Sequence, residues 1–302
     1  MTRSRSLAAL VLLGLCWAVT VPLNKVAVSS GHHPIGLIFW QLAICAAFTG
    51  LYLGLRGKLP RFGTALAGHC LVIALLGSIL PFSFIYRAIS QLPAGIVAIV
   101  IATVPMFALV ISLSIRIEAF SPVRLAGVLL GAIAVVILVG PDASLPDPDK
   151  AVFVLVAVLA YFCYGLEGNY VAWRAFRGYG PIQVICGASV VGALITGPVA
   201  WFSGAWVDLP GPWDNPERAL VLAALIHAFI YAGYLWLVGA TSPVFASQIA
   251  YVVTLGGVFF SALLLDERYS YWAFLALGLM MAGLFLVHPR QHRPGKPPYP
   301  AD

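Results

Sequence analysis

Long apolar segments recur along the whole chain, and they constrain its fold more than any other feature. Each runs for about 18 to 23 residues between charged residues, Pro or Gly, which is enough for a helix to cross a hydrocarbon core of about 30 Å. Only 9% of the 302 residues are charged, and 61% are hydrophobic. Soluble domains carry about 25% charge, and disordered chains combine high charge with low hydrophobicity. The sequence therefore predicts an all-α integral membrane protein.

Ten such segments predict ten transmembrane helices. The first follows a basic start and resembles a signal peptide, but its apolar run continues to Leu23, so we expect it to be retained as a helix. The predicted spans are residues 7–25, 34–55, 65–86, 93–115, 123–140, 151–173, 181–203, 219–239, 244–265 and 271–288.

Lys and Arg in the connections predict the orientation, because these residues are retained on the cytoplasmic side. With both termini inside, the outer segments hold only five of the 17 Lys and Arg, namely Lys25, Arg87, Lys150, Arg218 and Arg268. The basic residues are scattered singly rather than gathered on one face, so nucleic acid is not expected as a partner. We expect a multi-pass protein of the cell (inner) membrane with both termini cytoplasmic.

Two similar helix ends indicate an internal repeat. Glu118 and Ser121 precede the fifth span, Glu267 and Ser270 precede the tenth, and the glutamates are 267 − 118 = 149 residues apart. Each copy has five helices, an odd number, so the second copy enters the membrane from the opposite face. We therefore expect two inverted five-helix repeats, in which a substrate site lies near the midplane between the halves. The predicted parts are the first repeat 1–140, an outer linker loop 141–150, the second repeat 151–288 and a cytoplasmic tail 289–302.

These repeats resemble a known family. The residues that carry the resemblance to the EamA domain of the drug/metabolite transporter superfamily are Ala94, Gly95, Pro105, Glu118 and Gly127 in the first copy and Pro243, Glu267, Gly278 and Gly283 in the second. The resemblance covers nearly the whole chain and implies a ten-helix, exporter-like carrier of small metabolites or drugs. Substrates of various members include amino acids and their derivatives. Two positions depart from the family pattern. Ile117 stands where the family has a Gly-containing turn, and Thr254 stands at the position that corresponds to Pro105 of the first copy. The resemblance does not identify the substrate.

One face of the eighth span carries the best-placed candidates for a transport pathway. Polar groups at membrane depth must face protein or a water-filled cavity, because hydrocarbon leaves them unsatisfied. His227 lies about 12 Å into the span, and Tyr231 and Tyr234 follow on the same helix face. This stripe is predicted either to contact substrate and respond to protons near neutral pH, or to join helices by hydrogen bonding and packing.

Glu167 is the only acidic residue well inside a predicted span. It lies about 24 Å from the outer end of the sixth span. A carboxyl group at this depth is either a proton carrier for antiport or forms an ion pair or snorkelling contact near Arg174. An offset of 147 residues relates Trp17 to Tyr164 and Thr20 to Glu167, so we expect these four residues to face one another across the pseudosymmetry axis.

Further polar residues extend the predicted lining. Asn24 lies one turn beyond Thr20, and Gln248 and Tyr251 share a face of the ninth span; each either lines the pathway or packs between helices. Lys25 and Arg87 end their spans on the outer side, where they either attract an anionic substrate group or extend to lipid headgroups. The predicted substrate-binding set is Trp17, Thr20, Asn24, Tyr164, Glu167, His227, Tyr231, Tyr234, Gln248 and Tyr251.

Two GxxxG pairs permit close approach of helices. Gly50 with Gly54, and Gly127 with Gly131, fit packing either inside the bundle or between the subunits of a homodimer.

Together these features predict a secondary transporter that exports small metabolites, such as amino acids or drug-like compounds, by alternating access. No nucleotide-binding loop occurs in the sequence, so direct drive by ATP is not expected. Catalytic residues, a cofactor and a metal are not expected either, because the chain lacks an HExxH motif, an identifiable triad and a second deep carboxylate. The expected partners are a small-molecule substrate and membrane lipid. The alternatives are a flippase for lipids or lipid-linked substrates and, less favoured, a membrane-embedded enzyme.

Overall fold

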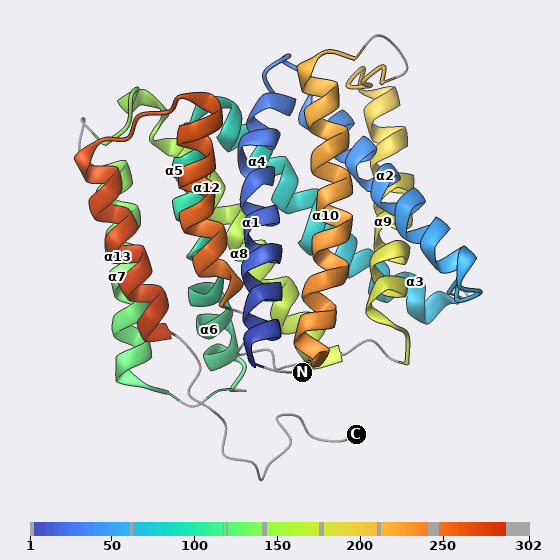
Figure 1. Cartoon of the computed structure of the whole chain (residues 1–302), viewed down its shortest axis with the longest axis horizontal. Coiled ribbons are helices and arrows are strands. Elements are labelled where there is room, and N and C mark those ends of the chain that lie inside the picture. The colour runs from blue at the N-terminus through green and yellow to red at the C-terminus, as the bar shows by residue number, and fades with distance from the viewer. Residues whose placement is uncertain are drawn as a thin grey trace.

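The computed structural model describes residues 3–60, 63–116, 118, 120–140, 144–174, 178–209, 213–240 and 248–287. Within these ranges it contains helices and no strands (Figure 1). The helices are α1 Arg3–Ala27, α2 Pro34–Leu55, α3 Thr64–Ala74, α4 Leu80–Gln91, α5 Ala94–Ile101, α6 Val104–Ser114, α7 Pro122–Val139, α8 Val152–Arg174, α9 Pro181–Phe202, α10 Asn215–Ala240, α12 Ile249–Leu265 and α13 Tyr271–Val287. A π-turn, η1 Leu75–Ile79, joins α3 to α4, and a 3₁₀ turn, η2 Pro148–Lys150, precedes α8. The predicted all-α fold is confirmed.

Local sequence explains where several helices begin. Proline occupies the first position of α2, α7 and α9, at Pro34, Pro122 and Pro181. Its fixed φ suits a helical first turn, and the N–H that it lacks has no partner within the helix there.

Eight helical segments of the described chain are long and apolar enough to cross a membrane, and α12 and α13 are shorter apolar helices. Three of the eight contain more than one element: Thr64–Gln91 contains α3, η1 and α4, Ala94–Ser114 contains α5 and α6, and Pro148–Val171 contains η2 and most of α8. The predicted boundaries need small corrections. The third span continues beyond Tyr86 to Gln91, and the eighth begins at Asn215, within a segment predicted to be loop. The predicted start of the ninth span, residues 244–247, lies outside the described residues.

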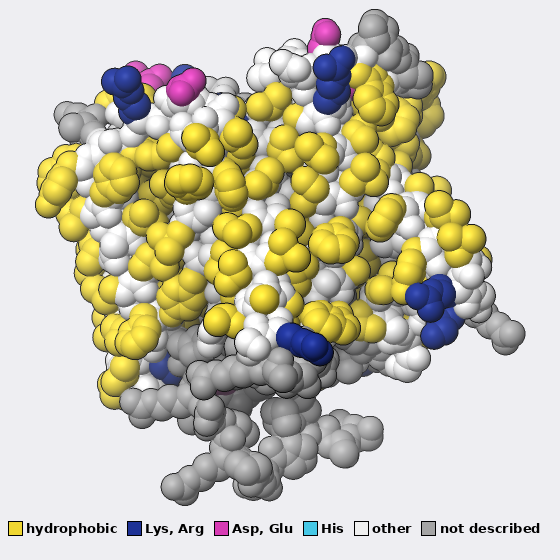
Figure 2. Space-filling view, viewed as in Figure 1, with side chains coloured by type: hydrophobic (Ala, Val, Ile, Leu, Met, Phe, Trp, Pro, Cys, Tyr) yellow, Lys and Arg dark blue, Asp and Glu magenta, His cyan; other side chains and the backbone are white. Residues whose placement is uncertain are grey.

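An apolar belt separates two charged ends. Figure 2 shows hydrophobic side chains over the middle of one face and charged side chains at its upper and lower edges. We call the end where α1 finishes the acidic end, defined by Asp147, Asp149, Asp208, Asp214, Glu217, Asp266 and Glu267. The opposite end, where α1 begins and α13 finishes, is the basic end, defined by Arg5, Arg56, Lys58, Arg116, Arg124 and Arg174. This distribution is that of a multi-pass membrane protein.

The most extensive helix packing joins the two halves of the chain. The main pairs are α7 with α13, α1 with α12, α2 with α9 and α1 with α10, and each takes one helix from each half (Figure 1). The pattern is also symmetric. α1 lies against α10 and α12 of the second half, and its counterpart α8 lies against α4, α5 and α6 of the first. The 149-residue repeat in the sequence therefore has a parallel in the helix packing.

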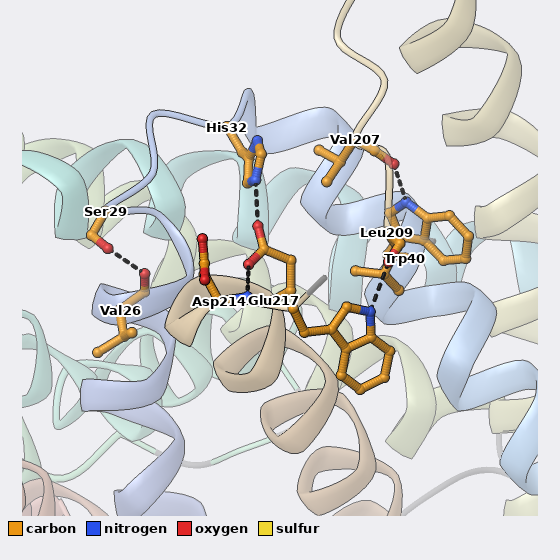
Figure 3. A network of polar contacts seen from close by, with 9 residues as sticks. Val26, Ser29, His32, Trp40, Val207, Leu209, Asp214 and Glu217 are labelled. Atoms are coloured by element: carbon orange, nitrogen blue, oxygen red, sulfur yellow. Dashed lines mark hydrogen bonds and ion pairs between the residues drawn. The ribbon is translucent and has the colours of Figure 1, made fainter. Parts of the chain in front are cut away.

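Polar contacts tie the connections at the acidic end to the helices (Figure 3). His32 Nε2 lies 3.0 Å from Glu217 Oε1, which joins the α1–α2 connection to the start of α10. The second carboxylate oxygen of Glu217 accepts a hydrogen bond of 3.1 Å from the backbone N–H of Asp214. The indole of Trp40 on α2 donates to the carbonyl of Val207 at 2.8 Å, so the connection between α9 and α10 is held against α2.

Glycines allow α7 and α13 to touch. A Cβ atom at Gly127 would lie 2.6 Å from the carbonyl oxygen of Gly283, and one at Gly283 would lie 2.7 Å from the carbonyl oxygen of Gly127. Gly131, the second member of this GxxxG pair, faces Met106 of α6. This pair therefore serves packing inside the bundle.

Replacing Gly127 with Ala is expected to lower the unfolding temperature in detergent by several degrees. The opposing atom is a backbone oxygen, which cannot move without displacing α13, and overpacking of this kind costs about 1–3 kcal/mol. Gly278→Ala is the matched control on α13, because a Cβ there meets nothing within 4 Å. It is expected to leave stability unchanged or slightly higher. Equal unfolding temperatures for the two variants would contradict this account.

Candidate functional site

A buried carboxyl group joins two helices, α8 and α10, by a hydrogen bond. Glu167 on α8 is 6% exposed, and it lies seven residues before Arg174, about 10 Å along the helix from the basic end. Its Oε1 atom accepts a hydrogen bond of 2.9 Å from the hydroxyl of Tyr231 on α10. Among the described residues no cation pairs with it. The predicted alternative of an ion pair with Arg174 is wrong, because that guanidinium lies over the Trp173 ring, 4.2 Å from its centroid.

Aromatic rings pack on Tyr231, the hydrogen-bond donor of this carboxyl group. The ring centroid of His227 lies 5.4 Å from that of Tyr231, one turn away on α10. His227 also packs edge-to-face with Phe82 of α4, with ring centroids 5.7 Å apart. Three predicted residues, Glu167, His227 and Tyr231, thus form one cluster. We call it, together with Phe82, the central cluster.

Other predicted residues lie beside α1. Trp17 packs edge-on against Tyr234 of α10, with ring centroids 6.5 Å apart. The hydroxyl of Thr20 donates to the carbonyl of Trp17 at 2.7 Å, so its hydrogen is used within its own helix. The buried Oδ1 atom of Asn24 has no hydrogen-bond partner in the described part of the chain. The role of Asn24 in a pathway stays a prediction.

The remaining predicted residues are more dispersed. Tyr164 packs beside Tyr161, with ring centroids 6.2 Å apart. Gln248 precedes the first residue of α12 near the basic end, and Tyr251 packs against the main hydrophobic core. The expected meeting of Trp17 with Tyr164 across the pseudosymmetry axis stays a prediction.

Sequence reasoning missed two features of this region. Gln41 of α2 is buried and accepts a hydrogen bond from the hydroxyl of Tyr86 on α4. The π-turn η1 brings Gly77 against the carboxyl group of Glu167, where a Cβ atom would lie 2.5 Å from Cδ. Gln41 is a polar residue at membrane depth, so the rule that identified Gln248 could have found it. The sequence offers a weaker sign of the π-turn, a Gly followed four residues later by Pro81.

Two charged side chains cap helix ends at the acidic end. Glu267 accepts hydrogen bonds from the backbone N–H groups of Ala94, at 2.6 Å, and Gly95, at 3.0 Å, at the start of α5. The hydroxyl of Tyr269 donates to the same carboxylate at 2.8 Å. Burial, and then this carboxylate, raise the pKa of Tyr269 above its usual value, so the phenol remains a donor. An anion at a helix N-terminus is favoured by the helix dipole.

Lys25 performs the complementary role at the end of α4. Its Nζ atom donates to the carbonyls of Ile89, at 2.7 Å, and Leu92, at 2.9 Å. The prediction that Lys25 extends to lipid headgroups or attracts an anionic group is therefore corrected, because the ammonium group is occupied by a helix C-terminus. A cavity of about 570 Å³ opens beside these caps, lined in part by Asp147, Lys150 and Arg268.

Comparison with known proteins decides the family. The model of the EamA-like transporter family matches residues 4–140 and again residues 152–288. The chain belongs to the EamA-like transporter family. This confirms the resemblance inferred from the sequence, and the double match agrees with an architecture of two repeats.

Two individual proteins are similar to this EamA-like transporter over most of its length. A protein of Escherichia coli (strain K12) named "Probable amino-acid metabolite efflux pump" is 25% identical over 288 residues, which cover 91% of this chain and 93% of the relative. A solved crystal structure has the same fold, with a TM-score of 0.60 at 20% identity, over 95% of this chain and 98% of the other. The family and the relative indicate a membrane transporter rather than an enzyme.

Replacing Glu267 with Gln in this EamA-like transporter is expected to destabilise the fold by about 2 kcal/mol. The amide keeps one acceptor oxygen for two backbone donors and loses its charge, and hydrogen bonds to charged groups contribute about 1.5–3 kcal/mol each. Thermal unfolding in detergent measures the effect. Asp266→Asn is the control, because Asp266 is exposed and adopts a left-handed φ of 54° that Asn also tolerates. If both variants unfold at the wild-type temperature, the caps do not stabilise the protein.

Proposed function

We propose that this EamA-like transporter is a secondary carrier that exports small metabolites, such as amino acids, their derivatives or drug-like compounds, by alternating access. The observation that carries the proposal is the buried Glu167 carboxyl group, which has one hydrogen-bond donor, Tyr231, and no ion-pair partner in the described chain. The name of the Escherichia coli relative supports the substrate class.

A carboxylate at membrane depth needs a positive partner, because leaving a buried charge uncompensated costs several kcal/mol. Glu167 can obtain one in two ways: it binds a proton, or it pairs with an ammonium group of the substrate. The two cations compete for the same oxygens. On the cytoplasmic side the acid releases its proton to water as the substrate amine binds, and on the outer side the exchange runs in reverse. The result is proton-coupled antiport.

The aromatic rings of the central cluster suit the rest of such a substrate. Tyr231 contacts the carboxyl group, His227 packs on Tyr231 and Phe82 packs on His227, so three rings adjoin the acid in sequence. Aromatic faces also attract ammonium groups, by about 0.5–2 kcal/mol. An amphipathic metabolite that carries an amine therefore fits this arrangement.

We assign the basic end to the cytoplasm, because basic residues are retained there. In this arrangement α12 and α13 also cross the cell (inner) membrane. The chain then has ten spans in two inverted repeats, residues 1–140 and 151–288, with both termini cytoplasmic. The pairing of helices between the halves supports the arrangement in two repeats.

Counterflow in proteoliposomes tests the proposal. Vesicles are loaded with a pool of amino acids, amino-acid derivatives and amines, and uptake is measured with and without a pH gradient. We expect the gradient to stimulate uptake by wild-type protein and by Asp149→Asn, which removes an exposed charge far from the central cluster. Glu167→Gln is expected to lose the stimulation, because an amide cannot release a proton.

Two results would contradict the proposal. Unchanged flux and pH dependence in Glu167→Gln would remove the coupling role. No flux of any pooled compound by folded protein, combined with transbilayer movement of a labelled lipid in the same vesicles, would favour the flippase instead.

Replacing His227 with Ala gives a separate expectation. The imidazole packs against Tyr231 and Phe82, so its loss enlarges the site without removing the carboxyl group. We expect KM for the transported compound to rise several-fold while the pH gradient still stimulates flux. Loss of that stimulation would instead make His227 a proton carrier.

A further inference from the structure

The π-turn η1 lies at the middle of a membrane span. Gly77 is 13 residues from the first and 14 residues from the last residue of the segment Thr64–Gln91. Within the turn the N–H of Leu80 donates to the carbonyl of Leu75, five residues earlier, instead of four. Pro81 follows immediately and has no N–H to donate. π-turns are rare and occur frequently at functional sites.

This turn points two residues at the central cluster. In a regular α-helix, residues five positions apart lie about 140° apart around the helix axis, because each residue advances by about 100°. Yet Gly77 contacts the Glu167 carboxyl group, and Phe82 contacts His227, which packs on Tyr231. A π-turn widens the helix locally, which reduces this angular separation and allows both positions to meet the cluster.

The absence of a side chain at Gly77 makes room for the carboxyl group. A Cβ atom there would lie 2.5 Å from Cδ and 2.9 Å from Oε2 of Glu167. These atoms are the flexible end of the Glu167 side chain rather than a backbone, so a methyl group can be accommodated if the carboxyl group turns away. Because the same carboxyl group accepts the Tyr231 hydrogen bond at 2.9 Å, turning away breaks that bond.

We propose that Gly77 is a positioning residue for Glu167. The bare Cα of the π-turn forms the wall that holds the carboxyl group against Tyr231, in the geometry where it exchanges its cation. The effect on transport rests on the function proposed above for Glu167, whereas the contact between Gly77 and Glu167 does not.

Four variants test the proposal. Gly77→Ala adds the methyl group. Gly68→Ala is the matched control in the same span, because a Cβ there meets nothing within 4 Å. The double variant Gly77→Ala with Glu167→Asp shortens the acid by one methylene and so restores the space. Glu167→Asp alone completes the cycle.

The first measurement needs no substrate. A hydrophobic carbodiimide reacts with buried protonated carboxyl groups, and mass spectrometry of purified protein measures the rate of labelling at residue 167. We expect Gly68→Ala to label like wild type. Gly77→Ala is expected to label at least threefold faster, because the displaced carboxyl group loses the Tyr231 donor that stabilises its charged form, and the double variant should return toward the wild-type rate. Equal labelling of Gly77→Ala and wild type would overturn the proposal whatever transport shows.

The second measurement is the stimulation of counterflow by a pH gradient. We expect Glu167→Asp to lower it when residue 77 is Gly, since the shorter acid reaches Tyr231 less well, and to raise it when residue 77 is Ala. A general packing defect does not produce this reversal of sign. If Gly77→Ala fails to fold, recovery of folding in the double variant supports the proposal, and failure to recover overturns it. If Glu167→Gln keeps its coupling to the pH gradient, the proposed function fails. The labelling result still decides whether Gly77 positions the Glu167 carboxyl group.

Discussion

Hydrocarbon offers no partner to a polar group, and this constraint shapes every interruption in the bundle. A continuous helix satisfies its own backbone, but this chain bends or breaks its helices at η1, between α5 and α6, and at the turn from α4 to α5. At that turn the freed carbonyls of α4 receive Lys25, and the freed N–H groups of α5 receive Glu267. Charged residues near the membrane surface therefore form hydrogen bonds to backbone groups at helix ends as well as to the surrounding water.

The same constraint makes the central cluster informative. Glu167 sits where an acid is costly, yet the described chain supplies one phenol and no cation to balance it. A purely structural polar contact is usually fully satisfied, since a partly satisfied one is more costly than apolar packing. Asn169, also on α8, meets this standard, because it uses both its amide hydrogens, donating to the carbonyls of Ala108 and Gly165. Because Glu167 has no positive partner in the described chain, we propose that it binds a transported cation.

Much of this arrangement could be predicted from the sequence, and the remainder has physical reasons for escaping it. Hydropathy locates the spans, and the paired motifs at Glu118 and Glu267 reveal the repeat. Glu167, His227 and Tyr231 stand out because polar residues are rare at membrane depth. Gly77 and Phe82 do not, because glycine and phenylalanine are common in apolar helices and their roles depend on the wider turn of η1. Likewise, the carbonyls that bind Lys25 belong to another helix, so local sequence cannot identify them.

The interleaved packing of the two halves has a consequence for biosynthesis. α1 packs against α12, but α12 begins 222 residues after α1 ends. At synthesis rates of about 5–20 residues per second, α1 waits roughly 10 to 45 s in the lipid before that partner emerges. The most extensive contacts of α1, α2 and α7 therefore form only after the second half of the chain has been made. A shortened chain that ends at residue 140, after the fifth predicted span, would consequently enter the membrane without the partners that cover these three helices.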